Sequence, residues 1–292
     1  MDIAGQGFYS LFKPCLPTNR NDYYAMSKLP LLRNIALLLG STLTFGASAI
    51  DMPTIDDPVI KACVERMMPA KTLSQGLTLR SFDDSGLIEE SVAKLYWGRD
   101  EEGKSRGVIR LSSPPSRKGL AVLMIENDAD EPKMYLYVPD LKRSRRVTGK
   151  QLATSMMGTD FSYEEFSHFQ NTASDAQTKR VEDQTLNDIS TYVFETTSTV
   201  PDPQYSRILT FVDQERCVPL QTQFFAPNGE LNKELIATGD EIKPVGDRHI
   251  PHQVTMHDRK KNTRTELTIE NVEIDIKLSD AIFSPKRLGM TP

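Results

Sequence analysis

Histidines, cysteines and paired carboxylates are the side chains of this sequence that could carry out chemistry. His249, His252 and His257 lie close together in the chain, and a zinc site would need such imidazoles to converge on one point. On one extended strand, His249 and His257 would share a face but lie about 27 Å apart. His252 would point to the opposite face, so the spacing favours surface or edge histidines over a metal site.

The acidic pairs do not indicate a catalytic dyad. Asp83-Asp84, Glu89-Glu90 and Glu101-Glu102 fall in turns or alternate across strands, whereas a dyad needs two carboxylates on one face of a cleft. The chain also lacks a Gly-x-Ser-x-Gly elbow, a His-Glu-x-x-His helix and the glycine-rich nucleotide motifs. We therefore expect no catalytic residue, no metal and no cofactor.

Composition excludes two further classes of protein. The chain has 292 residues with 35 basic and 40 acidic side chains, which gives a net charge of −5. A nucleic-acid-binding protein would need a strongly basic surface instead. No apolar run reaches the roughly 20 residues that a membrane-spanning helix requires.

The N-terminal region has the pattern of a secretory signal peptide that begins at Met26. Lys28 and Arg33 form a basic start, residues 35–45 are apolar, and Ala47-Ser48-Ala49 fits the cleavage rule. We expect residues 26–49 to be the signal peptide and residues 1–25 a non-structural extension or a misassigned start. Residues 50–292 would form a single periplasmic domain. A buried core helix is the alternative interpretation of the apolar stretch.

Two cysteines, Cys63 and Cys217, would remain in the exported chain. An oxidising compartment allows them to form a disulfide, but two separate buried thiols fit the sequence as well. No Cys-x-x-Cys pair occurs, so the sequence indicates neither a thiol oxidoreductase nor a zinc ribbon.

The elements that would position these residues are mainly β-strands. A helix is expected from Pro58 to Met68, and strand patterns follow between residues 73 and 147 and again between 189 and 276. Asn228-Gly229 is the strongest hairpin signal. Turn signals recur without alternating helices, which predicts a mainly β (α+β) fold with about ten or eleven antiparallel strands. Near Asn271 the apolar positions change from odd to even, which predicts a bulge or a bend.

Two segments in the middle of the chain allow a functional and a structural interpretation. Residues 142–146, Lys-Arg-Ser-Arg-Arg, form a dense basic cluster that could meet anionic headgroups or an acidic partner, or could be a solvated hairpin. Residues 154–170 are rich in Met and Phe and contain a helix start at Ser162. They could form an adaptable cover over an apolar cavity, or a helix that fills the barrel as ordinary core.

The same region carries a family resemblance. Residues 134–146, MYLYVPDLKRSRR, resemble the YLYxPxLKRxRR stretch of the outer-membrane lipoprotein-sorting proteins, a group related to LolA and LolB. Residues 158–165, GTDFSYEE, are similar to its GSDFSYED stretch. Tyr205 before a strand, the hairpin from Phe224 to Lys233 and the closing Ile282-Phe283 agree as well. The motif positions are Pro139, Gly158, Asp160, Phe161 and Tyr163.

This resemblance implies a half-open antiparallel β-barrel with a short helical lid, an apolar cavity and a periplasmic location. We expect a carrier that binds a lipid or lipoprotein by its acyl chain and passes it between membranes or to or from a transporter. Two alternatives are a non-enzymatic accessory subunit of a transporter of the RND/MMPL type, with a filled barrel, and, ranked below it, a lipid-modifying hydrolase.

The residues expected to act fall into two groups. The acyl chain would contact apolar side chains of the lid and of the strand beneath it, namely Met156, Met157, Phe161, Phe166, Leu136 and Val138. Headgroups or a transporter would meet the basic side chains Arg143, Arg145 and Arg146.

Overall fold

The computed structural model describes residues 58–67, 71–127, 132–169, 176–198 and 202–290. These residues belong to a single compact unit. The expected extension at 1–25 and the expected signal peptide at 26–49 lie outside the described residues. The domain boundaries therefore stay predictions.

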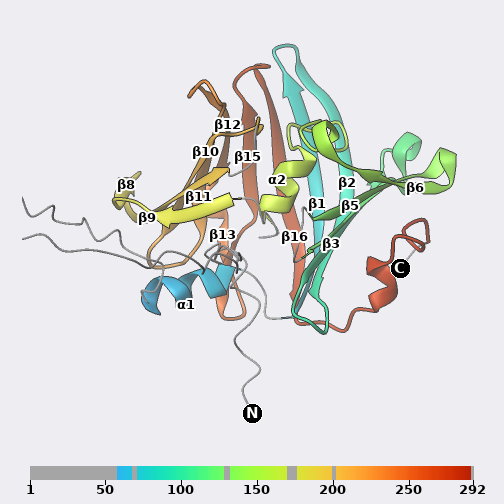
Figure 1. The fold of residues 1–292 in the computed structure, drawn as a ribbon, viewed down its shortest axis with the longest axis horizontal. Helices are drawn as coiled ribbons and strands as arrows, with labels where there is room; N and C mark the ends of the chain where they lie inside the picture. The colour runs from blue at the N-terminus through green and yellow to red at the C-terminus, as the bar shows by residue number, and fades with distance from the viewer. Residues whose placement is uncertain (1–57, 68–70, 128–131, 170–175, 199–201, 291–292) are drawn as a thin grey trace, which may run out of the picture. The chain divides into compact units, whose positions relative to one another are not determined.

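Two helices, sixteen strands and several short 3₁₀ turns are present in the described residues (Figure 1). In chain order they are α1 (Pro58–Met67), β1 (Thr72–Asp83), β2 (Gly86–Arg99), β3 (Ser105–Ser113), η2 (Pro115–Arg117), β4 (Ala121–Ile125), β5 (Lys133–Val138), η3 (Pro139–Leu141), β6 (Arg143–Val147), η4 (Gly149–Gln151), α2 (Tyr163–Phe169), β7 (Ala176–Arg180), β8 (Gln184–Leu186), β9 (Ile189–Ser198), β10 (Arg207–Asp213), β11 (Pro219–Phe225), β12 (Leu231–Ala237), η5 (Gly239–Glu241), β13 (Ile242–Val245), β14 (Arg248–Pro251), β15 (Gln253–Asp258), β16 (Thr263–Ile274) and η6 (Asp280–Phe283).

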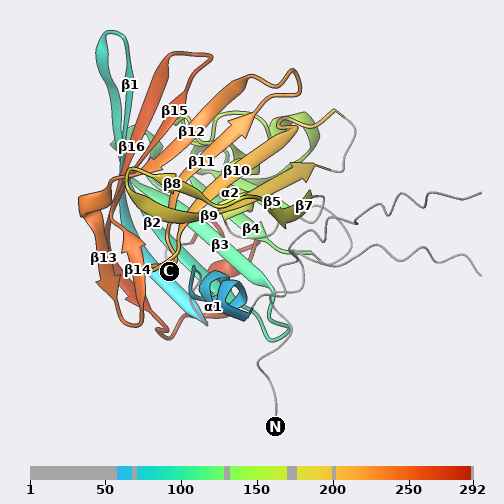
Figure 2. The ribbon, with the colours of Figure 1, turned by 90° about the vertical axis from the view of Figure 1, so that its left-hand side faces the viewer.

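Fourteen of these strands form one antiparallel sheet. Its order is β6-β5-β4-β3-β2-β1-β16-β15-β12-β11-β10-β9-β7, with β8 beside β9, while β13 and β14 pair separately. Figure 2 shows β1, β16, β15, β12 and β11 side by side in this order. Since β6 and β7 are the two ends of the order, the sheet does not close. The predicted fold class, a mainly β, half-open antiparallel barrel with an N-terminal helix and a short second helix, is confirmed.

The sheet has more strands than the ten or eleven predicted. Strands β7 and β8 carry the sequences AQTKR and QTL, which show no apolar alternation, so no pattern indicated them. The stretch from His249 to His257 was expected as one strand, but β14 ends at Pro251 and β15 begins at Gln253. His249 and His257 consequently lie on different strands.

Alternate residues of β5 face two different cores. On β5, Met134 and Leu136 belong to the large inner cluster, whereas Tyr135 and Tyr137 pack against the outer one. The outer cluster is covered by the C-terminal segment, through residues such as Leu288, which is fully buried. This period-two separation is what a pleated strand imposes on its side chains.

The predicted bulge near Asn271 is confirmed. Ser74 pairs with Glu273 but Gly76 pairs with Glu270, so the register of β1 and β16 shifts between them. Asn271 has a φ of 50°, a left-handed conformation that asparagine tolerates better than most residues. The extra residue moves the inward face of β16 from odd to even positions.

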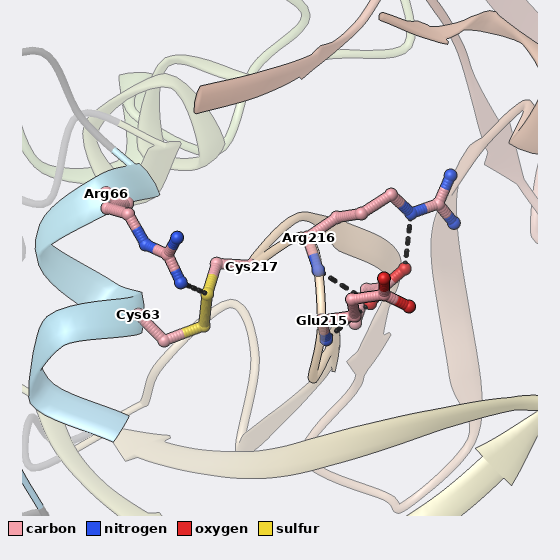
Figure 3. The surroundings of a disulfide bond; sticks show 6 residues. Cys63, Arg66, Glu215, Arg216 and Cys217 are labelled. Carbon is pink, nitrogen blue, oxygen red and sulfur yellow. Dashed lines mark hydrogen bonds and ion pairs between the residues drawn. A yellow bond between two sulfur atoms is a disulfide. The ribbon is translucent and has the colours of Figure 1, made fainter. Parts of the chain in front are cut away.

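Helix α1 is attached to the sheet by a disulfide between Cys63 and Cys217 (Figure 3). The two Cα atoms lie 5.1 Å apart, and both cysteines are buried with Phe194 and Val212. Arg66, one turn further along α1, points its guanidinium at the Cys217 sulfur, with Nη2 3.0 Å away. Of the two possibilities that the sequence left open, the structure has the joined pair.

Candidate functional site

The segment of residues 154–169, called the lid segment below, folds into a tight loop followed by α2. The amide of Met156 donates to the carbonyl of Phe161 at 2.7 Å, and the Ser155 hydroxyl donates to the carbonyl of Thr159 at 2.6 Å. Met157 and Gly158 turn the chain with φ values of 55° and 74°. These local bonds give the loop a defined shape before it contacts the sheet.

The apolar residues predicted to form the site lie together in the structure. Met156, Met157, Phe161 and Phe166 are 5–7% exposed and share the inner cluster with Leu136, which is 7% exposed. Val138 is half-buried and packs against the same cluster. The apolar side chains of the lid segment thus pack against the inner face of the sheet. Figure 1 shows the position of α2 among the strands.

A capping box begins α2. The amide of Ser162 donates to Glu165 Oε2 at 2.8 Å, and the amide of Glu165 donates to Ser162 Oγ at 3.2 Å. Each side chain therefore satisfies a backbone group at the first turn of the helix. The reciprocal bonds hold the Glu165 carboxylate at the first turn of α2.

The second oxygen of Glu165 enters a buried polar network. Lys233 Nζ, from β12, lies 2.9 Å from Glu165 Oε1 and donates to the carbonyl of Asp160 at 2.6 Å. The phenol of Tyr205 donates to the same Oε1 atom. Glu165 is fully buried and Lys233 is 5% exposed. Removing either partner of such a pair destabilises the fold strongly, because it leaves a buried charge without a counter-charge.

Tyr205, a member of this network, and the neighbouring Asp258 have shifted pKa values. Burial, together with the charge of Glu165, raises the pKa of Tyr205 far above its usual value, so its O–H remains a donor. Asp258 stands opposite Lys233 in the strand register. Burial alone would raise the pKa of Asp258, but hydrogen bonds from Lys261 outweigh it and leave the pKa lowered.

A second contact attaches the lid segment to β16. Asp160 accepts hydrogen bonds from Thr263 Oγ1 at 2.5 Å and Thr265 Oγ1 at 2.8 Å. The Asp160 amide donates to Thr265 Oγ1 at 2.9 Å. Thr265 is fully buried, so these bonds are shielded from water. The family-motif aspartate therefore connects the loop to the sheet.

The third contact comes from Arg117, which follows β3. Its Nη1 donates to the carbonyl of Met157 at 2.8 Å, and its Nη2 contacts Glu89 and Ser91 on β2. A Cβ at Gly158 would lie 2.9 Å from Arg117 Nη1. Glycine at this motif position therefore provides both the positive φ and the space for the guanidinium.

The two remaining motif residues have separate structural roles. Pro139 begins the 3₁₀ turn η3 between β5 and β6, where its fixed φ suits the first turn position. Tyr163 is buried in the inner cluster, and burial raises the pKa of its phenol.

The predicted arginines are exposed on β6, the edge strand of the sheet. The register pairs Arg143 with Val138 and Arg145 with Leu136, so these two are on the inner-face side, while Arg146 pairs with Tyr135 on the outer-face side. Arg146 lies over the Tyr135 ring, 6.0 Å from its centroid. The three arginines therefore do not form one patch on one face.

Several residues of the network had no role in the sequence-based hypothesis. Lys233 and Tyr205 were noted only as points of resemblance, and Thr263, Thr265 and Arg117 were missed. One signal was available for Lys233. It lies two residues from Leu231 and two from Leu235 on β12, so strand periodicity places it on the same face as these leucines. Its partner Glu165 is 68 residues away in the chain, and no local pattern connects them.

Two kinds of feature are absent from the described residues. No group of three or more histidine, cysteine, aspartate or glutamate side chains in the described part could hold a metal ion. Neither helix in that part is long and apolar enough to span a bilayer.

Comparison with known proteins places this geometry among related folds. No curated protein matches the chain. Among solved structures, a domain named for outer membrane lipoprotein sorting from Vibrio parahaemolyticus has a TM-score of 0.71 and 20% identity, covering 79% of this chain and 97% of its own. A DUF1329 family protein from Desulfovibrio piger has a TM-score of 0.69 and 19% identity, with 80% and 99% covered. A LolA superfamily protein from Nitrosomonas europaea has a TM-score of 0.62 and 17% identity, with 77% and 96% covered.

At these identities the likeness establishes the fold, an open β-barrel of the LolA type. A family model whose description reads "Uncharacterized protein" matches residues 103–290. That match includes the lid segment, β12 and β16, and hence every residue of the buried network. Because it spans more than half of the chain, the chain belongs to this family.

Proposed function

We propose that this protein is a periplasmic carrier that binds an acylated ligand, a lipid or a lipoprotein, between the lid segment and the inner face of the sheet. It makes and breaks no bond in that ligand, needs no cofactor and passes the ligand between membranes or to or from a transporter. The observation that carries the proposal is the lid segment itself. Its buried side is apolar, and polar contacts at Met157, Asp160 and Glu165 hold it against the sheet.

Displacing the lid segment would uncover a continuous apolar surface. Met156, Phe161 and Phe166 would leave the face of the sheet that contains Leu136. An acyl chain entering this space would gain about 0.8 kcal/mol for each buried methylene. Methionine and phenylalanine side chains repack readily around such a chain. Opening requires Lys233 and Asp160 to exchange their partners for water, which gives the carrier a barrier to release.

Arg143, Arg145 and Arg146 would act outside this space. Arg145 lies at the rim, where its Nη1 is 3.4 Å from Gln151 Oε1, and Arg143 and Arg146 are exposed along the same edge strand. They would contact anionic headgroups or an acidic surface of a transporter of the RND/MMPL type.

One observation favours a second candidate, an accessory subunit of such a transporter with a filled barrel. The lid side chains Met156, Met157, Phe161 and Phe166 are already 5–7% exposed, so they pack closely without any ligand. A lipid-modifying hydrolase is a weaker candidate, because the buried polar groups of the lid are engaged with one another.

The test is native mass spectrometry of protein expressed from the full chain and purified from the periplasm without detergent. We expect a discrete adduct that extracts into organic solvent as a lipid. Phe166→Ser should lose the adduct, whereas Ile88→Ser, at a side chain that is 58% exposed, should keep it. Circular dichroism would check that both variants are folded, and N-terminal sequencing of the product would locate the cleavage site.

The opposite result is equally clear. A clean ligand-free mass that persists after incubation with phospholipids and acylated peptides would reject the carrier and favour the filled-barrel subunit. An adduct that persists in Phe166→Ser would show that the lipid binds elsewhere.

A further inference from the structure

A groove lies at the edge of the sheet, between the β5–β6 hairpin and the C-terminal segment, and Arg143 is the one residue that it shares with the proposed function. One wall is the β5–β6 hairpin, through Tyr135, Tyr137 and residues 142–144, and the other wall is the C-terminal segment at residues 285–290. The groove has a volume of about 510 Å³, within the range of small-molecule sites. In Figure 1 the red C-terminal segment lies next to the hairpin that contains β6.

The two walls are firmly attached to each other and to the sheet. Ser144 Oγ donates to the carbonyl of Pro285 at 3.0 Å. On either side of Pro285, Phe283 and Leu288 are 4% and 0% exposed in the outer cluster. The groove is therefore bounded by residues that the core positions, even though its own lining is open to solvent.

A close approach of backbone to ring shapes the floor of the groove. Gly289 lies so near Tyr137 that a Cβ at this position would be 2.5 Å from the ring. Only glycine allows the C-terminal segment to cross the tyrosine at this distance. The tyrosine ring remains a wall of the groove because no side chain from residue 289 covers it.

The charged residues that line the groove are all basic. Lys142, Arg143 and Lys286 line it and are exposed, and none of its lining residues is a carboxylate. Within the described residues, these three cations have no ion-pair partner. The chain as a whole carries a net charge of −5, so the groove is a positively charged site on a negatively charged protein.

The lining indicates the chemistry of the ligand. Lysine and arginine together favour a phosphate oxygen, since arginine binds it with paired donors and lysine as a point charge. The rings of Tyr135 and Tyr137 and the side chain of Met290, which is 62% exposed, offer apolar contacts beside the cations. The ligand should therefore combine an anionic phosphate with an adjoining apolar group.

We propose that this groove binds the phosphate headgroup of an anionic glycerophospholipid, with the tyrosine rings against the glycerol and the first methylenes. Free phosphate esters share the anionic chemistry but lack the apolar part. Residues on alternate faces of β5 separate this site from the lid, because Tyr135 and Tyr137 face outward while Leu136 faces inward. Because Arg143 also belongs to the proposed headgroup contacts, the inference rests on that part of the proposed function. A failure of the groove would leave the acyl adduct under the lid intact, so the two failures can be told apart.

The experiment is a calorimetric titration of the full-length protein with dihexanoyl phosphatidylglycerol below its micelle concentration. We expect saturable binding that weakens as salt is added, because the contacts are solvent-accessible charges. Dihexanoyl phosphatidylcholine, with the same chains and a zwitterionic headgroup, should bind far more weakly. Equal binding of both lipids would overturn the proposal, and so would inorganic phosphate that binds as tightly as the anionic lipid.

Charge variants locate the binding. Arg143→Ala and Lys286→Ala should each weaken it by about tenfold, the effect of losing one charge-assisted contact. Both side chains are exposed, so the fold should be unaffected. Lys260→Ala, at an exposed lysine in the β15–β16 turn, is the matched control and should bind like the parent. An equal loss in the control would assign the binding to general surface charge.

A geometric variant separates a shaped groove from a positive surface. Gly289→Ala keeps every charge but forces the C-terminal segment away from Tyr137, so it should weaken binding while circular dichroism stays unchanged. Gly239→Ala, where an added Cβ meets nothing within 4 Å, is its control. Unchanged affinity in Gly289→Ala, or binding to anionic vesicles without binding to the monomeric lipid, would overturn the groove as the site.

Discussion

Lys233 on β12 and Glu165 on α2 form a buried ion pair with 2.9 Å between Nζ and Oε1. They connect the first turn of the lid helix to a strand in the middle of the sheet. Glu165 simultaneously caps its own helix through the Ser162 amide. One carboxylate thus links the local structure of the lid segment to its position on the sheet.

Replacing one partner of this pair should destabilise the protein more than replacing both partners. Glu165→Gln keeps an acceptor for the helix cap but leaves the Lys233 ammonium without a charged partner, and should lower the free energy of unfolding by about 3 kcal/mol. The double variant Glu165→Gln/Lys233→Met should recover much of this loss. Urea unfolding of the single and double variants measures the coupling between them.

The exposed pair of Arg80 and Glu90 provides the control. Glu90→Gln should leave the free energy of unfolding nearly unchanged, because exposed ion pairs contribute little. If the effects of Glu165→Gln and Lys233→Met simply add in the double variant, the two residues are not energetically coupled.

Gly158→Ala should loosen the lid segment. Its φ of 74° is unfavourable for alanine by about 1–2 kcal/mol, and the new methyl would displace Arg117 from the Met157 carbonyl. Hydrogen exchange measured by mass spectrometry should therefore speed up in residues 154–169. Gly239→Ala, which has room for a methyl group, should leave exchange unchanged. Unaltered lid protection in Gly158→Ala would show that the Arg117 contact does not hold the loop.

The free energy of unfolding should fall in acid, partly because Asp213 becomes protonated. Burial alone would raise the pKa of this carboxyl, but hydrogen bonds from the Arg216 amide and guanidinium and from the Glu215 amide outweigh it and lower the pKa. Because the folded-state pKa lies below the unfolded one, the stabilisation is complete above about pH 4 and is lost as the pH falls through the folded-state pKa. Asp213→Asn should consequently cost stability at about pH 7 and much less at about pH 2.

Urea midpoints of the parent and of Asp213→Asn at the two pH values test this expectation. Asp188→Asn, at an exposed aspartate in the β8–β9 turn, is the matched control and should change neither midpoint. A difference between the parent and Asp213→Asn that stays constant with pH would mean that the charge of Asp213 does not stabilise the fold.

The sequence contained the local parts of this structure in recognisable form. The alternation of β5 separates Leu136 from Tyr135, the Ser162 helix start precedes α2, and the parity change near Asn271 marks the bulge in β16. Each of these follows from residues that are close in the chain and from the period of the element they form. Strands β7 and β8 were missed because polar edge strands carry no such period.

The sequence by itself thus determined the fold class, the inward and outward faces of the strands and the apolar character of the lid segment. Only the tertiary structure decided which distant residues meet. Lys233 and Glu165 are 68 residues apart, Asp160 and Thr265 are 105 apart, and Ser144 and Pro285 are 141 apart. Their contacts depend on the order of strands in the sheet and on the path of the C-terminal segment across its outer face. Those arrangements arise from packing of the whole chain, and no periodic pattern along the sequence encodes them.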